Sequence, residues 1–389
     1  MPDAYFRSSL CAVCASVLKK DRSPRHGFCG LFETKSHTDT EITMRAAIFR
    51  EFRGPIRIEE VSISPLASHG ARILVKACGI CRSDWHAWMG HDRDVPLPHV
   101  PGHELAGVIQ EVGSSVKKFK VGDRVTVPFC CGCGTCYQCS LGNTHICDAH
   151  SQPGFTHWGA FAEQVDIEQA DVNLVALPDG IDFQTAASLG CRFITAFRAL
   201  VDQARVSAGQ WVAIHGCGGV GLSAIEIAKA AGALVIAVDI QPSRLESAKR
   251  LGADEIIDAN RVEVVQRIRE ITSRGADVSI DALGHPQTCW NSIACLAKRG
   301  KHVQVGLMLA DQASPSIPMD AVIAKELEIY GSHGMQPTQY GRIFSMIEKG
   351  LVSPQKLLSD TVSLQRGVEL LMRFAEFPNS AMTVIDLAL

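Results

Sequence analysis

The sequence lacks any long uninterrupted apolar run. A membrane-spanning helix needs about 18 or more consecutive apolar residues, and no such stretch occurs in the 389-residue chain. The nearest candidate runs from Trp211 to Val238, and His215, Glu226 and Lys229 interrupt it. We therefore expect no transmembrane helix and no membrane partner.

The chain also lacks a large excess of positive or of negative charge. Lys and Arg together number 38 and Asp and Glu 41, for a net charge of −3, which offers no electrostatic footprint for nucleic acid or an anionic membrane. With 46% hydrophobic and 20% charged residues, the chain is long and apolar enough to fold around large cores. At about 150 residues per domain, its length predicts two to three domains.

Cysteine, by contrast, is abundant and clustered. The chain has 15 cysteines, an odd number in a long chain, which is not typical of a small secreted disulfide scaffold. Metal-bound thiolates in a reducing compartment fit better, and we expect a cytoplasmic protein.

The first 43 residues differ from the rest because no helical or alternating pattern persists in them. We interpret residues 1–43 as an extension: a tail, a targeting peptide or a mis-assigned start. Cys11 and Cys14 could form a redox or metal pair, but no partner pair supports them. At Met44 the apolar run MRAAIFREF opens the folded body.

Two rhythms follow. From 44 to about 190, short alternating runs between Gly, Pro and Asp predict a barrel-like β domain. From about 195 to 330, strands alternate with helices, the last of which we expect at Gln287–Ala297. This alternation predicts an α/β doubly wound parallel sheet. Two amphipathic helices and a strand, Met382–Ile385, end the chain. We predict a nucleotide-binding domain, residues 194–331, inserted into a discontinuous catalytic domain, residues 44–193 and 332–389.

A glycine-rich turn carries a dinucleotide fingerprint. Residues 216–221 read Gly-Cys-Gly-Gly-Val-Gly, between a strand and a helix. Gly216 permits the tight turn, Gly218 lets the backbone approach the pyrophosphate, and Gly221 allows close helix–strand packing. Gly219 and Val220 complete the turn at a helix N-terminus, which favours phosphate. A glycine-rich turn of an unrelated α/β fold is the alternative.

An acid follows this turn at the spacing that the fingerprint requires. Asp239 comes 18 residues after Gly221, at the end of the next predicted strand. Its carboxylate is expected to bind the ribose hydroxyls and to repel a 2′-phosphate, which favours NAD over NADP. Arg244 lies nearby and keeps NADP open as an alternative.

Four closely spaced cysteines indicate a structural zinc site. The gaps between them are two, two and seven residues, and four thiolates can close a tetrahedral zinc site with no open position. Disulfides are the alternative, but short Cys-x-x-Cys pairs strain them. The predicted ligands are Cys133, Cys136, Cys139 and Cys147.

A second constellation predicts a catalytic zinc. Cys81, His103 and Cys191 would supply three ligands and leave a fourth position for substrate. Asp84 and Glu104 could support those ligands. From spacing alone, any of the three could instead be an ordinary core residue.

Together these segments resemble the zinc-dependent medium-chain alcohol dehydrogenase family, microbial tetrameric type. The segments GICRSDWH, PGHELAG, the four-cysteine loop, LGCRF and GCGGVG occur in the family's order. The resemblance covers about residues 44–389 and implies a GroES-like β-barrel catalytic domain joined to a Rossmann domain. It also implies two zinc ions per subunit, NAD, and a homotetramer.

The resemblance implies further roles for individual residues. Ser83 and His86 match a proton relay that passes through the cofactor ribose, Arg82 matches a pyrophosphate contact, and Thr195 matches a residue near the nicotinamide. The residues alone leave other interpretations open: Ser83 as a helix cap, His86 as a solvated surface histidine, and Arg82 as a partner of an acid.

The chain also departs from the family pattern. Asp92 stands where several relatives have a large aromatic residue, eleven positions after Cys81. Phe129 and Trp158 could line the substrate pocket or belong to the core. The expected reaction is reversible hydride transfer between a primary or secondary alcohol and NAD. A zinc polyol or amino-alcohol dehydrogenase is the alternative, and a non-catalytic binding protein is the third reading.

Overall fold

The computed structural model describes residues 42–308, 312–376 and 382–389. The predicted extension therefore lies almost entirely outside the described residues. The first strand, β1 (Thr43–Ile48), begins one residue before Met44 and pairs antiparallel with β2 (Arg57–Ser62). In the described part of the chain, no helix is both long and apolar enough to span a membrane.

A seven-stranded sheet occupies much of the first half of the chain and takes its last strands from the C-terminus. Its order is β14-β15-β3-β4-β5-β7, and β6 pairs with β3. The central strand β3 is buried or half-buried along its whole length, because it has neighbours on both edges. The strands are β3 (Ala71–Ile80), β4 (Glu104–Val112), β5 (Arg124–Thr126), β6 (Gln164–Ile167), β7 (Val175–Ala176), β14 (Leu358–Val362) and β15 (Met382–Asp386).

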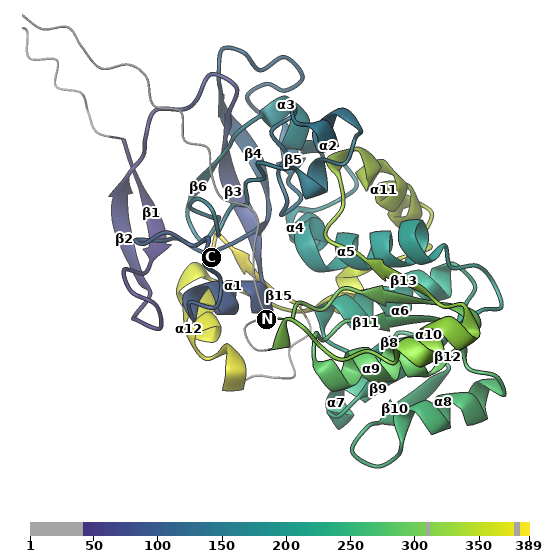
Figure 1. Cartoon of the computed structure of the whole chain (residues 1–389). Helices are drawn as coiled ribbons and strands as arrows, with labels where there is room; N and C mark the ends of the chain where they lie inside the picture. The colour runs from purple at the N-terminus through teal and green to yellow at the C-terminus, as the bar shows by residue number, and fades with distance from the viewer. Residues whose placement is uncertain (1–41, 309–311, 377–381) are drawn as a thin grey trace, which may run out of the picture. The chain divides into compact units, whose positions relative to one another are not determined.

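A second, six-stranded sheet is parallel throughout (Figure 1), in the order β10-β9-β8-β11-β12-β13. Helices connect its strands, and the order reverses between β8 and β11, as in dinucleotide-binding folds. The predicted doubly wound fold class is confirmed. The elements are β8 (Trp211–His215), α6 (Gly219–Ala230), β9 (Leu234–Asp239), α7 (Pro242–Arg250), β10 (Glu255–Asp258), α8 (Val264–Thr272), β11 (Ala276–Asp281), α9 (Pro286–Ala294), β12 (Leu296–Gln304), α10 (Met319–Lys325) and β13 (Glu328–Gly331).

One helical stretch connects the two sheets. α4 (Phe183–Ser188), η2 (Leu189–Phe193), α5 (Ile194–Phe197) and η3 (Arg198–Ala204) follow one another without a break, and η2 and η3 are π-helical. α4 contacts β3 and β4, whereas η2 and α5 contact α6. Wider π turns inside helices often occur at functional sites, and this one carries Cys191.

Two segments differ from the predictions. The helix predicted for Gln287–Ala297 ends at Ala294, and β12 begins at Leu296. A short apolar run such as this one fits a buried strand as well as a helix. The C-terminal part contains the two predicted helices, α11 (Tyr340–Glu348) and α12 (Leu364–Met372), and also β14, which was not predicted. The domain boundaries at 193/194 and 331/332 stay predictions.

Candidate metal and cofactor site

Three segments that are distant in sequence bring the second metal constellation together. Cys81 follows β3 and is the N-cap of α1 (Arg82–Trp88), His103 precedes β4, and Cys191 lies in η2. Their ligand atoms and a carboxylate oxygen of Glu104 all lie within 4.8 Å of one another. The structure thus gathers the predicted ligands and both predicted acids, since Asp84 also contacts His103.

The imidazole of His103 is oriented for a metal. Its Nδ1 lies 2.8 Å from Oδ1 of the fully buried Asp84, which also accepts the N–H groups of Cys81 at 2.9 Å and Gly102 at 3.1 Å. A carboxylate that accepts these bonds places the imidazole proton on Nδ1. Nε2 of His103 is buried and has no hydrogen-bond partner among the described residues. A neutral imidazole and two cysteine sulfurs suit zinc with an open position.

The two cysteines of this cluster are electrostatically linked. A hydrogen bond from Cys191 and the neighbouring His103 and Arg192 hold the pKa of Cys81 well below its usual value. The hydrogen bond to Cys81, burial and the negative charge on Cys81 raise the pKa of Cys191 well above its usual value. Without a cation the pair therefore favours one thiolate, and a divalent metal would let both ionise.

Glu104 forms a buried ion pair with Arg192. Nε of Arg192 donates to Oε1 of Glu104 at 2.9 Å, Nη2 donates to Oε2, and the carboxylate is fully buried. Gly79 and Gly219 leave room for this pair, because a Cβ at Gly79 would lie 2.3 Å from Oε2 of Glu104. At Gly219, the first residue of α6, a Cβ would lie 2.4 Å from Cδ of Arg192.

Arg192 was missed in the sequence, although an arginine inside the apolar run LGCRFITAF was a signal. Its guanidinium connects the carboxylate beside the metal ligands with the start of α6. The ion pair occupies both oxygens of Glu104, so the structure favours Glu104 as a support of the ligands rather than as a ligand.

The four-cysteine cluster lies within one loop. Its sulfur atoms all lie within 4.8 Å of one another. Sγ of Cys136 lies 3.6 Å from Sγ of Cys147, close to the ~3.8 Å edge of a tetrahedron with Zn–S bonds of about 2.3 Å. All twelve described cysteines are free thiols. The spacing fits metal ligation and not a disulfide.

Backbone donors stabilise these sulfurs. Sγ of Cys147 accepts the N–H of Cys133 at 3.3 Å, and Sγ of Cys133 accepts the N–H of Cys136 at 3.3 Å. Hydrogen bonds from Thr135 lower the pKa of Cys133 to about 6. The buried amide of Asn173 holds the loop, accepting the N–H of Gly132 at 2.8 Å and donating to its carbonyl at 3.0 Å.

The glycine turn after β8 has the geometry of the fingerprint. Gly216 has a φ of +95°, and a Cβ at Gly221 would lie 1.8 Å from the Gly216 oxygen. Nothing lies within 4 Å of the position of a Cβ at Gly218, so a ligand can approach the backbone there. Gly218 is the N-cap of α6, and Gly219 and Val220 begin its first turn.

The predicted ribose acid lies beside this turn. Asp239, at the end of β9, accepts the N–H of Cys217 at 2.7 Å and that of Gln241 at 2.9 Å. Nη1 of Arg244 lies 3.8 Å from its carboxylate. Partial burial and the nearby charge of Arg244 lower the pKa of Arg82. The structure thus brings Arg82 of α1 close to Arg244 of α7 and to Asp239 at the end of β9.

The alternatives for α1 can be compared with the contacts. Ser83 is not the helix cap; Cys81 is, and its Sγ lies 3.8 Å from Oγ of Ser83. In the part of the chain that the structure describes, no carboxylate forms an ion pair with Arg82, and no hydrogen bond joins Ser83 to His86. Nδ1 of His86 instead lies 2.8 Å from Nδ1 of His91. Burial lowers the pKa of His86 to about 4.

Aromatic rings surround His103. Phe155, which the sequence analysis missed, lies edge-on to its ring at 5.4 Å between centroids, and Phe129 does so at 6.3 Å. Thr195, one turn after Cys191, donates to its carbonyl at 2.7 Å. Trp158 lines a separate hollow of about 290 Å³ with residues of β6, and no predicted metal ligand lines it.

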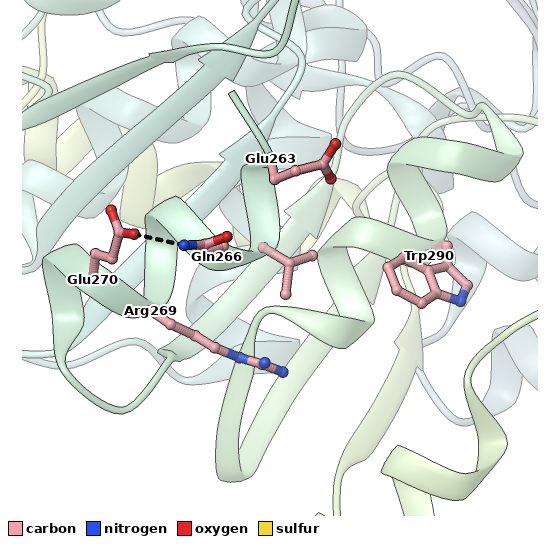
Figure 2. Close-up of a pocket in the computed structure, with 6 residues that line it drawn as sticks. Glu263, Gln266, Arg269, Glu270 and Trp290 are labelled. Atoms are coloured by element: carbon pink, nitrogen blue, oxygen red, sulfur yellow. Dashed lines mark hydrogen bonds between the residues drawn. The ribbon is translucent and has the colours of Figure 1, made fainter. Parts of the chain in front are cut away.

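A larger hollow, about 580 Å³, lies elsewhere, between α8 and α9 (Figure 2). Gln266 donates to Glu270 across its floor at 3.0 Å. None of the predicted site residues lines it, so it is no part of the metal and cofactor site. Its lining residues are Glu263, Val265, Gln266, Arg269, Glu270 and Trp290.

Comparisons with known proteins agree with this geometry. Residues 67–179 match the model of the alcohol dehydrogenase GroES-like domain, and residues 219–349 match that of the zinc-binding dehydrogenase. The first of these ranges includes six of the seven predicted metal ligands, and Cys191 lies between the two ranges.

Curated relatives cover nearly the whole described chain. An NAD-dependent alcohol dehydrogenase of Sulfurisphaera tokodaii is 34% identical over 86% of this chain and 97% of its own. A sorbitol dehydrogenase of Bacillus subtilis is 33% identical over 88% and 96%. The solved structure of the alcohol dehydrogenase TADH from Thermus sp. ATN1 has a TM-score of 0.81 at 29% identity, covering 88% and 99%.

Proposed function

The chain belongs to the zinc-dependent medium-chain alcohol dehydrogenase family, and we propose that Cys81, His103 and Cys191 form its catalytic zinc site. It is an oxidoreductase that acts on CH–OH groups, with zinc and NAD as cofactors. The observation that carries the assignment is the ring of His103, which offers a nitrogen within 4.8 Å of both cysteine sulfurs. Its Nδ1 binds Asp84, and its buried Nε2 has no hydrogen-bond partner among the described residues.

When bound, zinc supplies a Lewis acid for the alcohol oxygen and NAD accepts the hydride. Cys81 and Cys191 supply two negative charges that balance a divalent cation. Asp84 holds the ring of His103 in the tautomer that presents Nε2. The Glu104–Arg192 ion pair fixes η2, and therefore Cys191, against β4.

Other residues are proposed to bind the cofactor and to move the proton. Gly216, Gly218 and Gly221 shape the turn that meets the pyrophosphate, and Arg82 adds a positive charge there. Asp239 receives the ribose hydroxyls, with Arg244 beside it. Thr195 lies one turn from Cys191, where it faces the nicotinamide in the proposed arrangement. Ser83 and His86 pass the alcohol proton toward solvent through the cofactor ribose.

Cys133, Cys136, Cys139 and Cys147 are proposed to hold a second, structural zinc. Four sulfurs close the coordination shell, so no position remains for substrate. We further propose two functional divisions of the chain. Residues 44–193 and 332–389 carry the metals, and residues 194–331 bind NAD.

The physiological substrate is proposed to be a small primary or secondary alcohol. A polyol is the second candidate, because a curated relative is a sorbitol dehydrogenase. NAD reduction by the purified protein across simple, aromatic and polyhydric alcohols tests both. Turnover that a chelator abolishes and zinc restores supports the assignment. No turnover with both metal sites filled would contradict it.

We also propose a cytoplasmic homotetramer. All described cysteines are free thiols, as in a reducing compartment, and the resemblance to the microbial branch of the family implies a tetramer. Sedimentation of the purified protein tests the assembly, and a dimer would contradict it.

A further inference from the structure

The C-terminal end of α1 folds back on the helix through a glycine. Gly90 has a φ of +74°, and its N–H donates to the carbonyl of Ala87 at 3.1 Å. The N–H of His91 donates to the carbonyl of His86 at 3.0 Å. This pair of bonds is the Schellman motif, in which a left-handed residue turns the chain back over the last helical turn.

The turn places two imidazoles in contact. Nδ1 of His86 and Nδ1 of His91 lie 2.8 Å apart, so one of these nitrogens carries the proton and the other accepts it. The indole of Trp85 lies edge-on to both rings, at 5.0 Å from His86 and 5.6 Å from His91. Backbone and indole together hold the pair, whereas a pair of mobile surface histidines would have neither support.

The two rings differ in exposure. His86 is half-buried, and His91 is exposed to solvent. His86 lies in the helix that follows the metal ligand Cys81, and His91 is the ring of the pair that is open to water. The charged or titratable groups that act on His86 are His91, Arg82 and Cys81. Burial and the nearby positive charge of Arg82 lower the pKa of His86 and make a lasting charge on it unfavourable, so a proton that reaches it needs a route onward.

We propose that His91 is a positioning residue that fixes the tautomer of His86 and carries the relayed proton to water. The proposal rests on the alcohol dehydrogenase function above. With its proton on Nδ1 and directed at His91, His86 keeps Nε2 free to accept a proton. When Nε2 gains that proton, the Nδ1 proton passes to Nδ1 of His91, and the Nε2 proton of His91 leaves to water. Exchange of ring protons with water restores the first tautomers.

Kinetics of His91→Ala test this route in the zinc- and NAD-loaded enzyme. We expect kcat for alcohol oxidation to fall about tenfold near neutral pH, which is less than the ~10²–10⁴-fold typical of losing a general base, because His86 remains. KM should change little, added imidazole should restore kcat, and the pH profile should shift. His69→Ala removes a half-buried imidazole elsewhere and keeps the backbone carbonyl that accepts the N–H of Ala170 at 2.9 Å, so it should leave all of these unchanged.

A double variant distinguishes one proton route through both histidines from two independent effects on the rate. If both histidines act in series, His86→Ala with His91→Ala should be no slower than His86→Ala alone. Losses that multiply would overturn the proposal. So would a His91→Ala enzyme with the rate and pH profile of the wild type, or a loss that imidazole does not restore.

A second readout does not depend on turnover. The ¹⁵N spectrum of the histidine rings, assigned with His86→Ala, reports the tautomer of His86. We expect a protonated Nδ1 in the wild type and its loss in His91→Ala, and an unchanged ring spectrum would overturn the proposal. If the wild type fails to oxidise any alcohol, the proposed function falls and this inference falls with it. If the wild type turns over and His91→Ala behaves identically, only this inference falls.

Discussion

The two metal clusters are built in opposite ways. The four-cysteine cluster takes all its sulfurs from one loop, Cys133–Cys147, and three of its four cysteines are only half-buried. The other cluster takes Cys81, His103 and Cys191 from three elements, and two of these three ligands are buried. Backbone N–H groups stabilise the sulfurs of the first, whereas the side chains of Asp84, Glu104 and Arg192 surround the second.

This difference in construction suggests that the four-cysteine cluster serves stability and the other cluster serves catalysis. A loop that carries four ligands can close around a metal by itself, so its metal binding is local folding energy. A cluster that needs β3, β4 and η2 in place forms only when the fold is complete. As proposed, this cluster keeps one coordination position free, and it depends on buried charges that the fold must hold. Substitutions in the four-cysteine cluster should therefore lower stability, whereas substitutions in the other cluster should lower turnover.

The largest expected effect is on turnover, from Cys191→Ala. Loss of this ligand should lower kcat at least ~10³-fold, because the Lewis acid contributes several kcal/mol to the transition state. The four-cysteine loop is untouched, so we expect one zinc per chain to remain and the fold to persist. Rates with alcohol and the zinc content of the purified variant check this. Cys289→Ala, a buried cysteine outside both clusters, is the control, and near-normal turnover of Cys191→Ala would refute the ligand set.

Cys139→Ala should act on stability instead. Loss of a structural metal belongs to the mechanisms that cost about 4 kcal/mol or more, so thermal unfolding should begin at a much lower temperature. At low temperature, kcat of the surviving folded enzyme should stay within a few-fold of the wild type. Calorimetry together with rates measures both. A variant with wild-type stability, or with turnover lost while the fold persists, would contradict the division between the clusters.

Asp84→Asn should weaken zinc binding at the proposed catalytic site and leave the four-cysteine site unchanged. The variant keeps the shape but weakens the acceptor for Nδ1–H of His103, and such changes lower metal affinity or activity about 10–100-fold. Competition with a zinc chelator should show one weakened and one unchanged site. Two unchanged sites would show that Asp84 does not orient His103.

The smallest expected effect concerns the cofactor. Asp239→Gly removes the carboxylate proposed to bind the ribose, worth about tenfold in the preference for NAD over NADP. Ratios of kcat/KM for the two cofactors measure it, and zinc content should not change. An unchanged ratio would mean that another residue selects the cofactor.

The same contrast explains what the sequence could predict. Four cysteines at gaps of two, two and seven are a local pattern, and so is the glycine turn at 216–221. The α/β class followed from strands that alternate with helices, although the end of α9 was misplaced because the run around Cys295 fits either element. Local spacing therefore sufficed for the loop, the turn and the fold class.

Long-range partners were beyond the sequence alone. Nothing in the sequence pairs Arg192 with Glu104, since the two lie on different elements that only the folded chain brings together. In the sequence, Phe155 cannot be told from an ordinary core aromatic residue. Only the structure shows that its ring packs against His103. A glycine just past a helix, followed by a histidine, is a local pattern that Gly90 and His91 show in the sequence. Whether His91 contacts His86 depends on the rotamer of His86, which the sequence does not give.

The central claim is that Cys81, His103 and Cys191 bind a zinc ion distinct from that of the four-cysteine loop. Anomalous X-ray diffraction from crystals of the zinc-loaded protein, recorded on both sides of the zinc absorption edge, tests it most directly. The account predicts two peaks per chain, one between Sγ of Cys81, Nε2 of His103 and Sγ of Cys191 and one inside the loop. A single peak in the loop, with none at His103, would contradict it.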